Sequence, residues 1–244
     1  MKRLTQKFAK VDNGTVFENY SKLNEKEFKL FCYIVSELQV KNRLADKSDR
    51  DIYFFEGEEK EIEDVNVVEI PVSKKFHEIY NTHITLEEVK KIVAGVQSMV
   101  ISITKENEII FVNPFEAEIS LEPLTVTVKV KEEIVNYIVY LKNNWLTIYT
   151  NELKEITGKF MTGLYLKYRQ YENTGFVRMK VDDAKIYFGC GEEYPTKTLV
   201  NRLKMYTEKF NAKFKEKGVQ LELIIERNES TRKVTHIFIK INKI

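Results

Sequence analysis

The amino-acid sequence predicts an α+β protein, and three observations lead to this fold class. Residues 194–217 have a helical pattern with a basic outer face, and two β-rich runs joined by a polar, basic turn follow directly. The same order of elements occurs 109 residues earlier in the chain, so that Ser73 corresponds to Asp182. The composition, 43% apolar and 31% charged, is that of a folded globular protein. A helix followed by a hairpin with a basic tip is the layout of a winged helix, so we predict two tandem winged-helix domains of similar topology.

The first half of the chain carries the earlier copy of this pattern. Periodicity and β-propensity predict a helix over 24–40, a strand over 65–72, a short helix to Tyr80 capped by Ser73, a helix over 85–99, and a hairpin of 100–103 with 109–112. This hairpin completes the order strand, helix, turn, helix, hairpin. The β-rich runs 115–121 and 124–130 and a helix over 132–142 follow as additions.

An acidic segment interrupts the first half. Residues 44–70 hold ten acidic and three basic side chains, with a short β-rich run at 52–55. A run of this composition predicts a solvated linker. Two alternatives stay open, a negative flap that keeps DNA off this face and a binding site for a partner.

The second half repeats the pattern after a boundary at the polar residues Lys142, Asn143 and Asn144, which divides the chain into domains 1–143 and 144–244. Its predicted elements are a helical region over 150–171 bent near Gly158, a strand over 176–181, a short helix to Phe188 capped by Asp182, a glycine turn at 189–191, the helix within 194–217 capped by Thr196 or Thr198, and strands over 219–226 and 234–241.

Charge is distributed unevenly between the two domains. The net charge of +2 combines 39 Lys and Arg with 37 Asp and Glu. Residues 144–244 hold 19 basic and 12 acidic side chains, net +7, which leaves 20 and 25, net −5, for the remainder. Phosphate groups are attracted by basic surfaces. We therefore expect the second domain to bind DNA.

The helix within 194–217 has a buried side and a basic side. Apolar residues at spacings of three and four mark the buried side, namely Leu199, Leu203, Tyr206, Phe210 and Phe214. Over the whole stretch there are seven Lys or Arg and two Glu. A solvated surface helix would also show this bias, but the hairpin that follows favours a helix that reads DNA.

Specific DNA contacts are predicted from this orientation. A helix fits the major groove with its N-terminal half nearest the base edges, where Arg or Lys can bind guanine O6/N7 and Asn can bind adenine N6/N7. We therefore predict that the base readers are Lys197, Thr198, Asn201 and Arg202. Phosphate contacts are predicted for Lys204 and for three residues of the turn between the strands, Arg227, Arg232 and Lys233.

The sequence offers little support for a catalytic, metal-binding or membrane-bound protein. His77, His83 and His236 have no metal-ligand spacing, and Cys32 and Cys190 stand far apart, as two reduced thiols of a cytoplasmic protein would. The Gly-Lys pair at 158–159 lacks the rest of a phosphate loop. We find neither a signal peptide nor an apolar run of membrane-spanning length. We therefore expect no enzyme activity, no metal, no cofactor and no membrane contact, and a cytoplasmic location.

Two stretches carry a resemblance to a known family. They are LTIYTNELKEITGKFMTGLYLKYRQYENTG, residues 146–175, and YPTKTLVNRLKMYTEKFNAKF, residues 194–214, in which Tyr194, Lys197, Arg202 and Phe210-Asn211 stand at the family's positions. The chain from Trp145 onward resembles the replication initiators of iteron-containing plasmids, which have two winged-helix domains. Many members carry two adjacent basic residues where this chain has Arg202 alone.

The resemblance implies a DNA-binding protein that recognises direct repeats in a plasmid origin and helps to open neighbouring A·T-rich duplex. It also implies partners, namely the host initiator, the replicative helicase and a second copy of the chain bound through the N-terminal domain. Such dimers commonly repress their own promoter.

The first domain is predicted to have a supporting role. Its longer helix begins with Thr85, Leu86, Glu87 and Glu88, and two carboxylates disfavour a phosphate-facing helix end. We expect this domain to contribute backbone contacts or dimerisation, with Lys90 and Lys91 available for DNA. Two other functions remain open for the chain as a whole, a winged-helix transcriptional regulator without a replication role and a module that binds an acidic protein partner.

Overall fold

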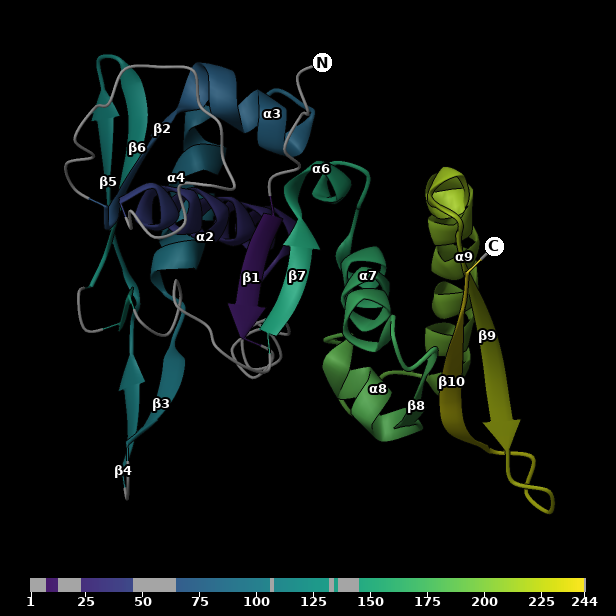
Figure 1. The fold of residues 1–244 in the computed structure, drawn as a ribbon. Coiled ribbons are helices and arrows are strands. Elements are labelled where there is room, and N and C mark those ends of the chain that lie inside the picture. The colour runs from purple at the N-terminus through teal and green to yellow at the C-terminus, as the bar shows by residue number, and fades with distance from the viewer. Residues whose placement is uncertain are drawn as a thin grey trace. The chain divides into compact units, whose positions relative to one another are not determined.

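A computed structural model describes residues 8–12, 23–45, 65–105, 108–131, 134–135 and 145–243 (Figure 1). Along these residues the elements are β1 (Phe8–Asp12), α2 (Glu25–Ala45), β2 (Val67–Pro71), the π-helical turn η2 (Val72–Phe76), α3 (His77–Tyr80), α4 (Leu86–Gln97), β3 (Ile101–Lys105), β4 (Glu108–Val112), β5 (Phe115–Leu121), β6 (Leu124–Val130), β7 (Trp145–Tyr149), α6 (Thr150–Leu153), α7 (Lys159–Tyr171), β8 (Phe176–Lys180), α8 (Val181–Tyr187), α9 (Thr196–Phe214), the 3-10 turn η3 (Lys215–Lys217), β9 (Val219–Arg227) and β10 (Val234–Lys243).

The chain forms two compact units. The first contains β1 and the described residues from Lys26 to Lys154, and the second contains residues 23–25 and the described residues from Glu155 onward. We predicted a boundary after residue 143, whereas the division into units falls after Lys154. The reason is that β7 pairs antiparallel with β1 and so belongs to the first unit.

The first unit has its core between a three-stranded sheet and the helices α2 and α4. The sheet order is β2-β6-β5, and the register sets Val68 opposite Val128 and Ile70 opposite Val126. These four side chains are buried, as are the apolar stripes of the two helices, Phe28, Phe31, Cys32, Val35 and Leu38 of α2 with Val89, Ile92, Val93 and Val96 of α4. The predicted helical periodicity is therefore confirmed for both helices, except at Leu86 in the first turn of α4, an apolar residue of the same stripe that is 36% exposed.

The wing of the first unit is formed by other strands than we predicted. The hairpin β3–β4 forms a separate two-stranded sheet, and β5 and β6, predicted as additions, complete the winged helix. The physical reason is burial: Val126, Val128 and Val130 of β6 can face the core, whereas Ile109 and Phe111 of β4 are 63% and 72% exposed.

The second unit follows the same plan. Its sheet order is β8-β10-β9, with α7, α8 and α9 in the order α7-β8-α8-α9-β9-β10. The predicted bend at Gly158 is confirmed, because this glycine, at φ 80°, separates α6 from α7. Stacked aromatic rings fill the core, with Phe210 on Phe214 at 4.3 Å and Phe160 on Phe188 at 5.2 Å.

The predicted repeat is confirmed. β2 and β8 are each five residues long and begin at Val67 and Phe176, 109 residues apart, and each runs directly into a short helix. In both sheets the first strand pairs with the last one, β2 with β6 and β8 with β10. The chain thus has the predicted α+β fold of two winged helices.

Three of the predicted helix caps are wrong. Ser73 lies inside η2 and Asp182 inside α8, while Thr196 and Thr198 lie in the first turn of α9. The N-cap positions belong to Pro71, Lys180 and Pro195. β2 and β8 run directly into their helices, whereas α9 follows the turn at 192–194.

Two sequence predictions concern residues outside the described part of the chain. Most of the acidic segment 44–70, including the predicted strand at 52–55, lies there. So does the predicted helix over 132–142, apart from Ile134 and Val135.

Candidate nucleic-acid interface

The buried side of α9 matches the sequence prediction. Leu199, Leu203, Phe210 and Phe214 are fully buried, and Val200 and Thr207 are buried beside them. Tyr206, the fifth residue of the predicted stripe, is half-buried and stacks on Phe160 of α7 at 5.6 Å. The orientation of α9 about its axis is therefore determined by its apolar side chains.

Polar contacts hold α9 against the rest of the second unit. The side-chain amide of Asn211 donates to the carbonyl oxygen of Leu221 at 2.9 Å, and its oxygen accepts from the Leu221 N–H at 2.7 Å. These two hydrogen bonds join the helix to the start of β9. Lys213 donates to the carbonyl oxygen of Glu155 at 2.6 Å. The helix is thus a rigid platform for the side chains on its outer face.

The outer face of the first two turns of α9 carries four of the predicted contact residues. Lys197, Thr198, Asn201 and Lys204 are all exposed. From Lys197 to Lys204 the helix rises about 10 Å, which matches about three base-pair steps. The exposed carboxylate of Glu208 lies one turn further along the same row and would repel DNA. The surface suited to a base edge therefore ends near Lys204.

Arg202 lies on the flank of this face. Its guanidinium is 5.6 Å from the ring centre of Phe160 and 5.8 Å from that of Tyr194. Contacts of a cation with aromatic faces contribute about 0.5–1 kcal/mol each at exposed sites. Arg202 therefore stabilises the packing of α9 against α7, besides being a predicted base reader. Sequence reasoning missed this second role, because Phe160 is 42 positions away in the chain.

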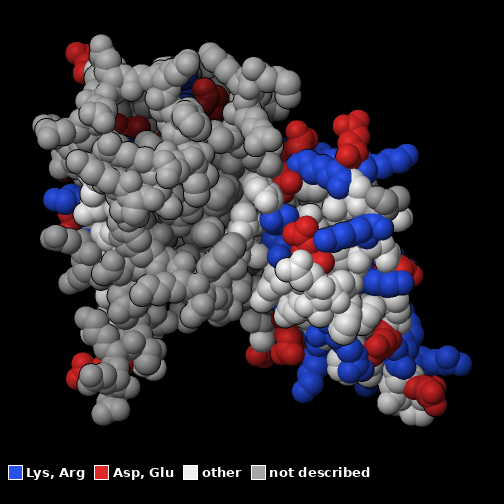
Figure 2. Space-filling model, in the orientation of Figure 1, with Lys and Arg blue, Asp and Glu red and all other residues white. Residues whose placement is uncertain are grey.

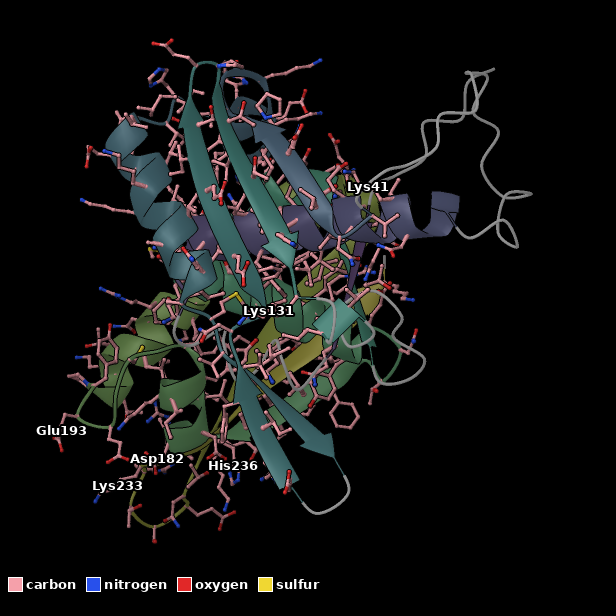
Figure 3. All side chains as sticks on the ribbon, turned by 90° about the vertical axis from the view of Figure 1, so that its left-hand side faces the viewer. Lys41, Lys131, Asp182, Glu193, Lys233 and His236 are labelled. Carbon is pink, nitrogen blue, oxygen red and sulfur yellow. The ribbon has the colours of Figure 1, made fainter. Side chains whose placement is uncertain are left out.

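The turn that enters α9 is acidic. Glu192 and Glu193 are exposed and directly precede Tyr194 and Pro195, and Asp182 lies in the first turn of the nearby α8. Figure 3 shows Asp182 and Glu193 at the same end of the second unit as Lys233. Carboxylates at this point disfavour a phosphate group near the helix end. Attraction for phosphates must therefore come from Lys204 and the wing.

The wing of the second unit is the turn 228–233 together with Arg227 and Val234, the strand ends that flank it. One asparagine, Asn228, organises this turn. The Asn228 side-chain oxygen accepts from the N–H groups of Ser230 and Thr231, at 3.1 and 2.9 Å, and from both hydroxyls, at 2.7 and 3.1 Å. Backbone bonds join Asn228 to Arg232 and Lys233, at 2.9 and 2.8 Å. Arg232 has φ 56°, which closes this turn.

The three predicted phosphate-binding residues of the wing differ in their contacts. Arg227 donates to the carbonyl oxygen of Arg232 at 3.1 Å and so helps to shape the wing. Arg227, Arg232 and Lys233 are all exposed. Figure 2 shows Lys and Arg side chains at the end of the second unit where the wing lies. A preformed turn loses little conformational entropy on binding, which favours affinity.

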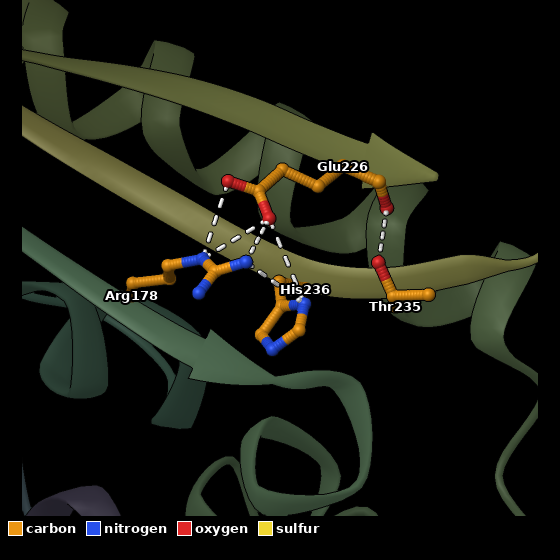
Figure 4. Close-up of polar contacts among 4 residues, drawn as sticks. All are labelled: Arg178, Glu226, Thr235 and His236. Atoms are coloured by element: carbon orange, nitrogen blue, oxygen red, sulfur yellow. Dashed lines mark hydrogen bonds and ion pairs between the residues drawn. The ribbon is translucent and has the colours of Figure 1, made fainter. Parts of the chain in front are cut away.

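An ion cluster joins the three strands at the base of the wing (Figure 4). Arg178 of β8 donates to Glu226 of β9 through Nε and Nη2, at 3.0 and 2.6 Å to Oε2, and His236 of β10 lies 3.6 Å from the same oxygen. The hydrogen bond from Arg178 lowers the pKa of Glu226. This carboxylate is thus ionised and neutralised by Arg178, so that it adds little repulsion at the wing.

Figures 1 and 3 both place the start of α9 and the wing at one end of the second unit. The structure thus brings the predicted base readers and the wing residues to a common end of one winged helix. The residues that sequence reasoning missed are Asn228, Arg178 and Glu226. Asn211 was named only as a position of the resemblance, and its contact with Leu221 was not predicted. A signal existed for Asn228, since Asn followed by Ser and Thr favours a side-chain-bonded turn. Arg178 and Glu226 are 48 positions apart and offered none.

The corresponding helix of the first unit has a different start. Thr85 and Glu88 form a capping box, with the Thr85 N–H donating to Glu88 at 3.1 Å, and Lys26 donates to the same carboxylate at 2.7 Å. The bond from Lys26, followed by that from Thr85, lowers the pKa of Glu88 to about 2. Glu87 pairs with Lys90 at 2.9 Å. Two ionised carboxylates therefore occupy the end of α4 where phosphate would have to bind.

The described residues were considered for a metal site and for a membrane span, and they show neither. They contain no group of three or more His, Cys, Asp or Glu side chains that could hold a metal ion. Among the helices that the structure describes, none combines the length and apolarity needed to cross a membrane.

Comparison with known proteins gives matches among solved structures. No family model matches the sequence, and a search of curated proteins finds no match either. Among solved structures, the fold is similar to that in the crystal structure of the Pi initiator protein in complex with iteron DNA, with a TM-score of 0.68. The match covers 99% of each chain at 12% sequence identity. At this identity the similarity shows a common fold across both units.

Proposed function

We propose that this chain, which has the fold of the Pi initiator protein, is a plasmid replication initiator that binds direct repeats at an origin. The observation that carries the proposal is the two-turn outer face of α9 with Lys197, Thr198, Asn201 and Lys204, at the same end of the unit as a preformed basic wing. That the Pi structure contains iteron DNA supports the choice of ligand.

The second unit reads the sequence in this proposal. The first two turns of α9 enter the major groove, where Asn201 pairs with adenine and Lys197 or Arg202 with guanine. Lys204, Arg227, Arg232 and Lys233 bind phosphates and set the register without selecting a base. Arg202 reaches a base only at the edge of the footprint, because Phe160 and Tyr194 hold its guanidinium on the flank.

The first unit supports binding without reading bases. Its α4 begins with ionised Glu87 and Glu88, and the cap and Lys26 occupy the polar groups of that turn. We propose that this unit contributes backbone contacts or a dimer contact with a second copy. A fragment of the first unit that bound the repeats with full specificity would contradict this division of roles.

The remaining parts of the proposal follow the family resemblance. The protein would help to open A·T-rich duplex next to the repeats, recruit the host initiator and the replicative helicase, and repress its own promoter as a dimer. We propose that it does so in the cytoplasm and without enzymatic activity or a cofactor.

Footprinting of the full-length protein on the DNA that flanks its own gene tests the proposal. We expect protected direct repeats spaced by roughly 20 bp, about two helical turns. A plasmid that carries these repeats and depends on the protein for its maintenance would establish the replication role. A single protected inverted repeat without such maintenance would indicate a transcriptional regulator. The absence of protection on any duplex would favour a protein-binding module.

A further inference from the structure

Met205 is an apolar residue in the middle of a polar surface. It is 41% exposed, and it is the one large apolar side chain exposed along α9, all of whose residues are described. The buried side of the helix is formed by Leu199, Leu203, Phe210 and Phe214, so packing does not need Met205. A single exposed apolar side chain is ordinary on a protein surface. The evidence for a contact is therefore the position of Met205 on the face that is proposed to bind DNA.

The position of Met205 on α9 places it among the predicted base readers. It lies four residues after Asn201 and three after Arg202, which puts all three on adjoining parts of the helix surface. It precedes Glu208, where the surface suited to DNA ends. If α9 enters the major groove as proposed, Met205 would lie near the C-terminal limit of the surface that can face base edges.

Base edges in the major groove offer one apolar group. They present hydrogen-bond donors and acceptors, and the C5-methyl group of thymine. A thioether side chain is a poor hydrogen-bond partner, but it is flexible and polarisable and fits irregular apolar surfaces. Along the helix Asn201 and Met205 are about 6 Å apart, and base pairs are about 3.4 Å apart. Met205 can thus reach a base within about two steps of the one that Asn201 reads.

We propose that Met205 is a specificity-determining residue that contacts the C5-methyl group of a thymine, within two base pairs of the adenine read by Asn201. This inference rests on the proposed function and adds to it one defined base preference at the C-terminal limit of the footprint. It names the feature that is recognised, a methyl group, and not only the residue that recognises it.

Deoxyuridine substitution tests this inference, because uracil differs from thymine only by the missing methyl group. The full-length protein first selects duplexes from a randomised pool. Each thymine of the selected duplex is then replaced singly by deoxyuridine, and Kd is measured for the wild type and for Met205→Ala, Met205→Leu and Thr198→Ser. Thr198→Ser removes the other methyl group on this face while keeping the hydroxyl, and Met205→Leu keeps an apolar side chain.

We expect one deoxyuridine position to weaken wild-type binding about fourfold, the effect of losing one buried methyl contact. At that position deoxyuridine substitution should not change the Kd of Met205→Ala. It should weaken the binding of Met205→Leu and of Thr198→Ser by the same factor as for the wild type, whatever their affinity for the thymine duplex. If the pool yields a defined sequence but no position distinguishes Met205→Ala from the wild type, the inference is wrong and the proposed function stands. If the pool yields no sequence, the proposed function fails and this inference with it.

Discussion

The wing offers the sharpest test of DNA binding, because its contribution can be predicted from charge. In the variant Arg232→Gln/Lys233→Gln the two exposed cations are removed, while the hydrogen bonds of Asn228 that shape the turn remain. Each phosphate that a protein neutralises contributes about 0.9 to the slope of log K against log salt. Loss of both contacts should therefore reduce the magnitude of this slope by about 1.8.

This change in slope gives a measurable difference in affinity. Between 50 and 200 mM salt, a difference of about 1.8 in slope changes the ratio of wild-type to variant affinity about twelvefold. The variant should thus be weakest relative to the wild type at low salt. The assay is fluorescence anisotropy of a labelled duplex at four or more salt concentrations. The loss should be equal for repeat and random sequences, because phosphate contacts carry no sequence information.

A matched control separates a local contact from net charge. Lys240→Gln/Lys243→Gln removes two exposed cations from β10, the strand that follows the wing. Lys240 lies 3.8 Å from Glu222, and Lys243 lies 3.9 Å from Glu172. Lys240 lies six residues beyond the start of β10, roughly 20 Å from the wing. We expect the control to retain the wild-type slope. Equal slopes for both double variants, or an unchanged slope for the wing variant, would refute the assignment of Arg232 and Lys233 as phosphate contacts.

Three further predictions concern α9, its entry and the first unit. Asn201→Ala should weaken binding to the selected duplex by about 1–3 kcal/mol and leave random DNA and thermal stability unchanged, since Asn201 is exposed; equal losses on both duplexes would exclude a base contact. Glu192→Gln/Glu193→Gln should strengthen binding to all duplexes alike at low salt, because two carboxylates are removed from the turn before α9; a change confined to one sequence would contradict this. For Glu88, whose pKa falls from 4.5 to about 2 on folding, the stabilising contribution is present above pH 4.5 and is lost as the pH falls towards 2. Urea unfolding followed by circular dichroism should therefore show a smaller decrease in unfolding free energy over this range for Glu88→Gln than for the wild type, and parallel pH profiles would argue against the pairing with Lys26.

Local sequence patterns were sufficient to predict the helices and the repeat. The stripe of Leu199, Leu203, Phe210 and Phe214 could be predicted because helical periodicity depends on neighbouring positions alone. The relation between β2 and β8 could be found for the same reason, since each strand is a short alternating run followed directly by a helix.

Strand pairing in the first unit could not be predicted in this way. The β3–β4 hairpin and the strands β5 and β6 all have β-rich sequences, and the prediction took as the wing the hairpin that follows the helix directly in the sequence. Which strands join the core sheet depends on whether their side chains reach the helices, and Val126 and Val128 do so while Ile109 and Phe111 remain exposed. That selection is made between residues far apart in sequence.

For the candidate interface, the sequence by itself determined which residues face outward on α9. It also determined that a hairpin with a basic turn follows this helix. Both features depend on short-range spacing. The tertiary structure alone decided how those side chains are held. Arg202 lies against Phe160, Asn211 pairs with Leu221, and Arg178 neutralises Glu226 across β10. Each of these contacts joins two elements, and their geometry exists only once the core has brought the elements together.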